Sequence, residues 1–271
     1  AVVLLLSVLS PPFQRGGAGD VVRYLSTVNM AVVGLVFAVL LRLFVEVPIA
    51  HTGIWVNLLT GLAFLSIAVG NLLALNQSNL KRLLGCSSIA HFGYILVAIV
   101  AGGALSLEAI NMYLLTYVVT TIGAFGVVAL TSSPYTSKDA DAIFDYRGLF
   151  WRRPYLTAVL TVMMLSLAGI PFTAGFIGKF YIAAIGVDAQ LWWLLGALVV
   201  GSAIGLFYYL RVVVALFMPT PGMRRMEADT FWGVRLGGIM VIAMAALMFL
   251  LGVYPEPAIE LVQIASVAVF R

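Results

Sequence analysis

The chain has 271 residues, of which 63% are hydrophobic and only 10% are charged. This composition excludes a soluble globular domain and predicts an all-α polytopic membrane protein. The net charge of +4 comes from 15 basic and 11 acidic residues scattered along the chain, which does not favour binding to nucleic acid. The single cysteine, Cys86, excludes an intrachain disulfide and a CxxC site, so we expect no metal and no redox centre in this chain.

Residues 1–27 are predicted to be a helix stump followed by a loop. The apolar stretch 1–10 is too short to cross a bilayer and has neither a methionine nor a basic region before it, which argues against a signal peptide. We interpret it as the end of a helix whose beginning is missing, so that the chain is the C-terminal part of a longer protein. A processed or naturally short protein is the alternative.

Residues 28–253 are predicted to form a transmembrane bundle of about seven helices. The expected spans are 28–45, 54–75, 87–104, 108–131, 155–187, 190–218 and 232–253. The tail, 254–271, is too short to span comfortably and is predicted to lie at the membrane interface or against a neighbouring protein.

The third span carries a face of residues that could move protons. Ser87, Ser88, His91 and Tyr94 stand three or four positions apart, so a helix brings them to one side. Histidine titrates near neutrality and is a natural relay group. A histidine that only forms a hydrogen bond to a neighbouring helix is the other interpretation.

The fourth span carries a stripe with the spacing i, i+3, i+4, i+7, formed by Tyr113, Thr116, Tyr117 and Thr120. These hydroxyl groups could line water, and hydrogen bonds between helices are an equally common use of such residues. The polar loop that follows, 132–154, contains a short amphipathic stretch, 139–151, which we place at the interface.

The fifth span is the most unusual stretch of the chain. As one straight helix it would be about 50 Å long, against a hydrocarbon core of about 30 Å. Pro171 removes a backbone donor, and Gly169, Gly175 and Gly178 lower the cost of an unwound or closely packed backbone. The sequence therefore predicts two half-helices with a break between them.

Lys179 follows this break and is the strongest functional candidate. It lies eight residues before Val187, about 12 Å of helix, which is more than its side chain comfortably spans by snorkelling. A lysine at the centre of a membrane helix costs about 2.5 kcal/mol or more, and such residues normally face protein or water. A snorkelling or structurally paired lysine is the alternative. In the next span, the small-residue face of Gly201 and Gly205 is interpreted as packing.

The charged residues indicate the orientation of the chain. Alternate connections hold the basic residues Arg15, Arg23, Lys81, Arg82, Lys138, Arg147, Arg152, Arg153, Arg224 and Arg225. By the positive-inside rule these loops are cytoplasmic and the C-terminal tail lies outside. All eleven carboxylates fall in loops or near helix ends. An anion that pairs with Lys179 must then come from a missing part of the chain or from another subunit.

Four motifs give the chain a family resemblance: Asn79 to Tyr94 (NLKRLLGCSSIAHFGY), Asp145 to Trp151 (DYRGLFW), Met163 to Pro171 (MMLSLAGIP) and Gly175 to Tyr181 (GFIGKFY). In these motifs the chain resembles the C-terminal half of subunit N of bacterial respiratory complex I, the proton-translocating NADH:quinone oxidoreductase. The match is close over residues 70–218 and thinner to the C-terminus.

The resemblance implies an antiporter-like fold of two inverted repeats, each with a broken helix, of which this chain holds mainly the second. It implies that Lys179 belongs to an outer proton half-channel and that His91 connects it inward. It also implies a multi-pass protein of the bacterial inner membrane that contacts other complex I subunits, including a neighbouring antiporter-like subunit and small helical subunits. NADH, FMN, iron–sulfur clusters and quinone would be bound by partner subunits, with no cofactor in this chain.

The N-terminal region departs from the family pattern. The resemblance implies a further lysine on the helix before residue 70, and the candidate stretch 26–34 contains none. Residues 11–20 do not follow the first broken-helix pattern either. Two other functions therefore stay open. One is a membrane subunit of a cation/proton antiporter or hydrogenase, and the other is a scaffold subunit that does not pump.

Overall fold

The fold is known from a computed structural model that describes residues 53–131, 142–219 and 236–269. Regular structure in these ranges is helical, apart from one antiparallel bridge between Asn79 and Ala142. The predicted span 28–45 and the divergent stretches 11–20 and 26–34 lie outside the described residues, as do Lys138, Arg224 and Arg225.

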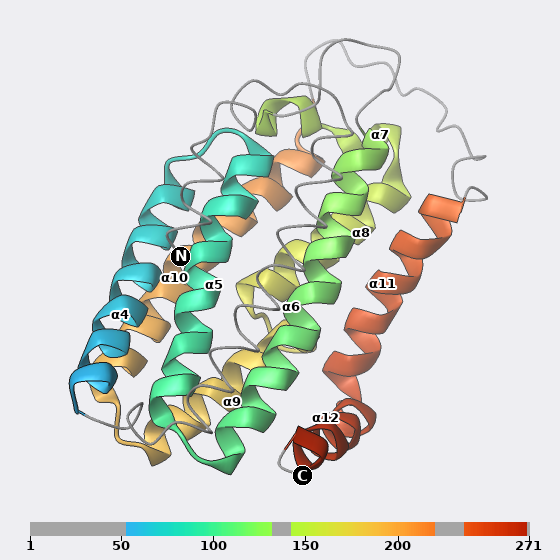
Figure 1. The fold of residues 1–271 in the computed structure, drawn as a ribbon. Helices are drawn as coiled ribbons and strands as arrows, with labels where there is room; N and C mark the ends of the chain where they lie inside the picture. The colour runs from blue at the N-terminus through green and yellow to red at the C-terminus, as the bar shows by residue number, and fades with distance from the viewer. Residues whose placement is uncertain (1–52, 132–141, 220–235, 270–271) are drawn as a thin grey trace.

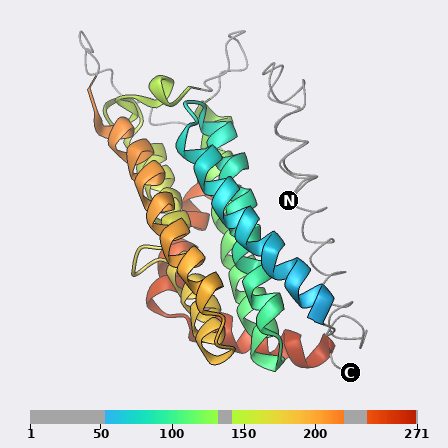
Figure 2. The same ribbon diagram turned by 90° about the vertical axis from the view of Figure 1, so that its left-hand side faces the viewer.

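The described helices form a bundle whose long members run side by side (Figure 1). In chain order they are α4 (Gly53–Leu75), α5 (Leu80–Ala101), α6 (Ala104–Thr131), the 3₁₀ turn η2 (Ile143–Tyr146), α7 (Leu149–Arg152), α8 (Pro154–Ala168), α9 (Ala174–Asp188), α10 (Trp192–Phe217), α11 (Leu236–Val253) and α12 (Glu256–Val269). The last helix lies across one end of the bundle, as Figure 2 also shows.

Four of the described helices, α4, α5, α6 and α10, are long and apolar enough to cross a membrane. The α8 helix is shorter, and α11 with α12 could form a fifth span that bends by 91° between them. The α5 helix begins at Leu80, before the start of the predicted third span at residue 87. The side chain of Asn79 caps it by accepting a hydrogen bond from the Arg82 N–H, so Lys81 and Arg82 belong to the first turn.

The core is centred on α5, in which nearly every residue is buried. This helix packs against α4, α6, α9 and α10, so its side chains meet those of four other helices. In contrast, α4 and α10 leave many large apolar side chains exposed, such as Leu58, Phe64, Trp193 and Phe207. Such outward faces are what a bilayer or a neighbouring membrane protein would cover.

Several basic residues gather at one end of the bundle, where α5 and α8 begin and α10 ends (Figure 1). The chain is tied together there by backbone bonds, such as Gly148 N–H to the carbonyl of Ala215 at 3.2 Å. Arg211 closes the end of α4, because it donates to the carbonyl oxygens of Leu75 at 3.2 Å and Gln77 at 2.5 Å.

Candidate functional site

The α8 and α9 helices are the two halves of one broken segment, separated by residues 169–173. The first half ends at Ala168 because Gly169 adopts a left-handed conformation with φ of 83°, which glycine tolerates. Pro171 follows within the break, where its ring cannot continue the preceding helix. The second half begins at Ala174. The break predicted in the fifth span is confirmed.

The other two glycines lie inside α9, where they allow close packing. A Cβ atom on Gly175 would collide with the carbonyl oxygen of Ser166 in α8, and one on Gly178 would lie 3.0 Å from Cδ2 of Tyr113. The Gly175 N–H also donates to Ser166 Oγ at 3.2 Å. The start of α9 is therefore held directly against the last turn of α8 and against α6.

Lys179 reaches from α9 to the C-terminal end of α8. Its side chain is buried, and Nζ donates to the carbonyl oxygens of Leu167 and Ala168, both at 2.9 Å. These carbonyls belong to the last turn of α8 and have no partner within that helix. The two preceding carbonyls of α8 accept hydrogen bonds from the Gly169 N–H. The four terminal carbonyls of α8 are thereby all satisfied.

This arrangement stabilises the ammonium form of Lys179 through backbone dipoles. The C-terminal end of a helix carries a partial negative charge that favours a cation. Nζ also lies 5.5 Å from the ring centroid of Tyr94, within the range of a cation–π interaction. The anion that the sequence led us to expect, from a missing part of the chain or from another subunit, stays a prediction.

His91 is buried on α5 and has a tyrosine hydroxyl at each ring nitrogen. Nδ1 lies 2.6 Å from the Tyr113 hydroxyl of α6, and Nε2 lies 3.1 Å from the Tyr209 hydroxyl of α10. The Tyr117 ring lies 5.0 Å from the imidazole, between centroids. A neutral imidazole has one donor and one acceptor, so one of the two bonded hydroxyls donates to the ring while the other accepts from it.

A small cavity separates His91 from Lys179. It is lined by both residues, by Ser166 and by the α6 stripe Tyr113, Thr116, Tyr117 and Thr120. About 10 Å³ is open to the centre of a water molecule, which is close to the smallest space that holds one water. The structure thus brings the predicted stripe to the same cavity as the predicted lysine and histidine.

The hydroxyl groups around this cavity also bond within the protein. Thr116 donates to the carbonyl of Tyr113 at 3.0 Å, and Thr120 to that of Thr116 at 2.6 Å. Oγ1 of Thr120 lies 3.2 Å from Ser166 Oγ, which links α6 to the end of α8. Each hydroxyl oxygen keeps a lone pair that could accept a bond from water.

Ser87 and Ser88 are buried on α5 but do not line the cavity. Their hydroxyl groups donate to carbonyls of the preceding turn, those of Leu84 at 2.9 Å and Gly85 at 2.6 Å. Within the described ranges, no group of three or more His, Cys, Asp or Glu side chains comes together as a metal site would require.

A second polar cluster was missed by the sequence analysis. Asn71 of α4 donates from Nδ2 to the Tyr94 hydroxyl at 3.2 Å and accepts at Oδ1 from the Tyr208 hydroxyl at 3.1 Å. Tyr208 neighbours Tyr209, the partner of His91, with 4.5 Å between ring centroids. The sequence feature that could have revealed this cluster is Asn71 itself. A polar side chain within an apolar span costs free energy unless it forms a hydrogen bond to another helix.

Amine, imidazole, phenol and hydroxyl groups therefore form one buried set between Asn71 and Ser166. Each can donate a hydrogen bond, and each except the charged amine can accept one. Gly201 packs over the same cluster, because a Cβ there would lie 2.8 Å from Nδ2 of Asn71. A chain of such groups inside an apolar bundle is suited to transferring protons, and the cavity between Lys179 and His91 is about large enough to hold one water.

The fold and this site define a class, that of polytopic helical membrane proteins with an antiporter-like bundle and a broken helix. The chain belongs to the NADH:quinone oxidoreductase/Mrp antiporter transmembrane family, whose model matches residues 21–205. It is 61% identical over 258 residues to NADH-quinone oxidoreductase subunit N of Ectopseudomonas mendocina, covering 95% of this chain and 51% of that protein. The family resemblance and the fold class inferred from the sequence are confirmed.

Solved structures agree with this assignment. A chain of respiratory complex I from Thermus thermophilus matches 75% of this chain and 45% of its own length, with 37% identity and a TM-score of 0.63. A chain of the archaeal membrane-bound sulfane sulfur reductase matches 85% of this chain and 45% of its own, with a TM-score of 0.74 and 23% identity, which shows the fold alone. The chain spans about half the length of the curated relative.

Proposed function

We propose that this chain is part of a subunit N of bacterial complex I, in which it translocates protons while quinone is reduced elsewhere in the complex. Three things support the proposal: the identity to subunit N over 95% of the chain, the broken helix, and the buried amine that faces His91 across a cavity. The observation that carries it is the position of Lys179 Nζ, held by two carbonyls at the break.

In the proposed mechanism Lys179 exchanges a proton with the outer aqueous side. His91 passes protons along the axis of the bundle through Tyr113 and Tyr209, while Thr116, Tyr117 and Thr120 orient water in the cavity. Tyr94 contacts the ammonium group with its ring and the Asn71 cluster with its hydroxyl. The dipoles that hold Nζ belong to a helix end, so a shift of α8 against α9 would change how readily the amine keeps its proton.

We also propose where the chain lies and which subunits it contacts. It lies in the bacterial inner membrane with its basic end in the cytoplasm, beside a neighbouring antiporter-like subunit and small helical subunits. NADH, FMN, iron–sulfur clusters and quinone are held by partner subunits. The outward apolar faces of α4 and α10 are suited to such neighbours and to the bilayer.

The test is Lys179→Ala in the assembled complex, with Lys138→Ala as the matched control because it removes the same charge from the polar loop 132–154. Inverted membrane vesicles are energised with NADH, and proton uptake is measured relative to NADH oxidised. We expect Lys179→Ala to lose most of its uptake while the complex assembles in normal amounts, and Lys138→Ala to match the wild type.

Two results would exclude the proposal in different ways. Unchanged uptake in Lys179→Ala, and also in a variant that lacks His91 as well, would favour the scaffold interpretation. Uptake that requires sodium ions and persists without NADH would favour a cation/proton antiporter.

A further inference from the structure

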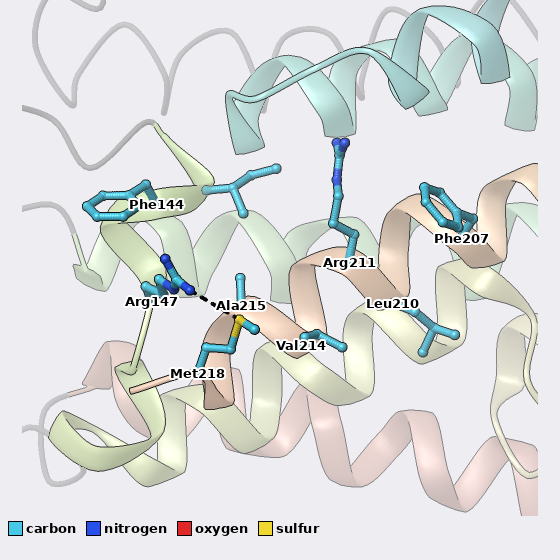
Figure 3. A pocket seen from close by; sticks show the side chains of 9 residues that line it. Phe144, Arg147, Phe207, Leu210, Arg211, Val214, Ala215 and Met218 are labelled. Atoms are coloured by element: carbon cyan, nitrogen blue, oxygen red, sulfur yellow. Dashed lines mark hydrogen bonds between the residues drawn. The ribbon is translucent and has the colours of Figure 1, made fainter. Parts of the chain in front are cut away.

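A groove at the basic end of the bundle is distinct from the buried site, and its place on the cytoplasmic side of a larger complex rests on the proposed function. It has a volume of about 540 Å³ and is formed by α10, η2 and the residue after η2 (Figure 3). Phe207, Leu210 and Val214 follow one another along α10, while Phe144 and Arg147 stand beside the C-terminal end of that helix. All three α10 side chains are exposed.

Among the residues that the structure describes, the groove is lined by two positive charges and no negative one. Arg147 and Arg211 line it, and none of the described lining residues is acidic. The contacts of the Arg147 guanidinium are the sulfur of Met218, 3.4 Å from Nη2, and the ring of Phe144, 5.8 Å from its centroid. Neither group neutralises the charge.

Within the described part of the chain, the side-chain contacts of these two arginines include no carboxylate. The guanidinium of Arg211 donates to two backbone carbonyls at the end of α4. The carboxylate of Asp145, close to Arg147 in sequence, accepts a hydrogen bond from the backbone N–H of Ala142. The groove therefore combines an apolar floor with a positive potential.

Its dimensions and position fit one leaflet of a bilayer. From Phe207 to Met218 the helix rises about 16 Å, which is about half of a 30 Å hydrocarbon core. Arg147 lies at the C-terminal end of this stretch. At the same end, Trp151 Nε1 donates to the carbonyl of Phe217 at 3.4 Å. Tryptophan and arginine at a helix end are typical of the headgroup region.

We propose that the groove binds an anionic phospholipid, with the phosphate beside Arg147 and one acyl chain along Phe207, Leu210 and Val214. The charge of Arg211 adds to the potential that attracts the headgroup. Basic pockets between helices at the cytoplasmic side of a membrane bind such headgroups. A helix of another subunit fits less well, because helix interfaces in membranes are rich in small residues, whereas this floor consists of large side chains.

The experiment uses the purified complex in nanodiscs of phosphatidylcholine with a minor fraction of phosphatidylglycerol, and counts the phosphatidylglycerol retained per complex by native mass spectrometry. Arg147→Gln removes the proposed phosphate contact. Arg153→Gln is the matched control, since this arginine lies at the same end, is exposed and donates to the carbonyl of Leu130 at 3.0 Å outside the groove. Val214→Trp fills the groove and keeps both charges.

We expect Arg147→Gln to bind phosphatidylglycerol about fivefold more weakly, the factor that corresponds to about 1 kcal/mol for each basic residue near an anionic surface. Val214→Trp should lose the same lipid, Arg153→Gln should retain it, and excess inorganic phosphate should not displace it. Equal retention in Arg147→Gln and wild type, displacement by phosphate, or equal retention of phosphatidylcholine would overturn the proposal. Loss of a subunit in place of a lipid would overturn it as well and assign the groove to a protein partner.

Discussion

The hydroxyl of Tyr209 is predicted to be as important for proton transfer as the imidazole that it contacts. Tyr209→Phe keeps the ring in place and removes only the hydroxyl, which lies 3.1 Å from His91 Nε2. The neutral imidazole then loses a hydrogen bond worth about 1 kcal/mol, and the imidazolium loses one worth about 1.5 to 3 kcal/mol. The charged form is therefore destabilised by about 0.5 to 2 kcal/mol more than the neutral form.

This difference lowers the population of the imidazolium about two- to thirtyfold. A relay that passes through the charged ring should slow by the same factor, whereas assembly should be unaffected because the aromatic packing remains. Proton uptake by inverted vesicles, divided by NADH oxidised, measures the effect. Tyr254→Phe is the control, because its side chain is exposed beyond the end of α11 and lies far along the chain from the cluster.

One result would refute this reasoning. If Tyr209→Phe pumps as well as the control while Tyr113→Phe pumps poorly, the Nε2 side of His91 carries no proton. The ring would then only be positioned by Tyr209, and the path would run from Nδ1 to the cavity.

Two further predictions concern stability. Gly175→Ala should lower the stability of the complex by about 1 to 3 kcal/mol, the usual cost of overpacking, because the added methyl group collides with the Ser166 carbonyl. Thermal melting measures this loss. Gly196→Ala is the control and should melt like the wild type, because a Cβ at Gly196 meets nothing within 4 Å. Asn71→Leu should cost about 1 to 3 kcal/mol by removing the hydrogen bonds of Asn71 to the Tyr94 and Tyr208 hydroxyls. Melting of Asn71→Leu above that of the wild type would contradict the bonding inferred for this cluster.

The parts of the site that the sequence predicted have local signals. Pro171 and Gly169 interrupt a helix whatever surrounds them, and a lysine in an apolar run is visible without a fold. The stripe on α6 follows from spacing alone, since residues at i, i+3, i+4 and i+7 share a face in any helix. These features could be read before the packing of the bundle was known.

The missed parts depend on contacts between helices. Tyr209 meets His91 across more than a hundred positions of the chain, and Asn71 meets Tyr208 in the same way. No spacing rule connects α4, α5 and α10, so tyrosines on an apolar helix look like ordinary core residues. The predicted apolar span began at residue 87, and the Asn79 cap extends the helix before it to include the two basic residues.

The contacts of Lys179 at the break are made by backbone atoms, which the sequence analysis did not consider. The expected anion, from a missing part of the chain or from another subunit, stays a prediction. Among the described residues, Lys179 donates to the carbonyls of Leu167 and Ala168, which are free acceptors because α8 stops there. The break that the sequence predicted therefore also provides the carbonyl acceptors for the amine, so the break and the lysine site depend on each other.

In the proposed mechanism the ammonium is stabilised by the end of one half-helix and carried on the other, so we expect its protonation to depend on the distance between α8 and α9. Ser166 connects the two halves through the Gly175 N–H and reaches α6 through Thr120. A displacement of α6 would then act on the α8–α9 junction directly, and a signal that moves this one helix could load or release a proton at Lys179 without any charged side chain moving toward it.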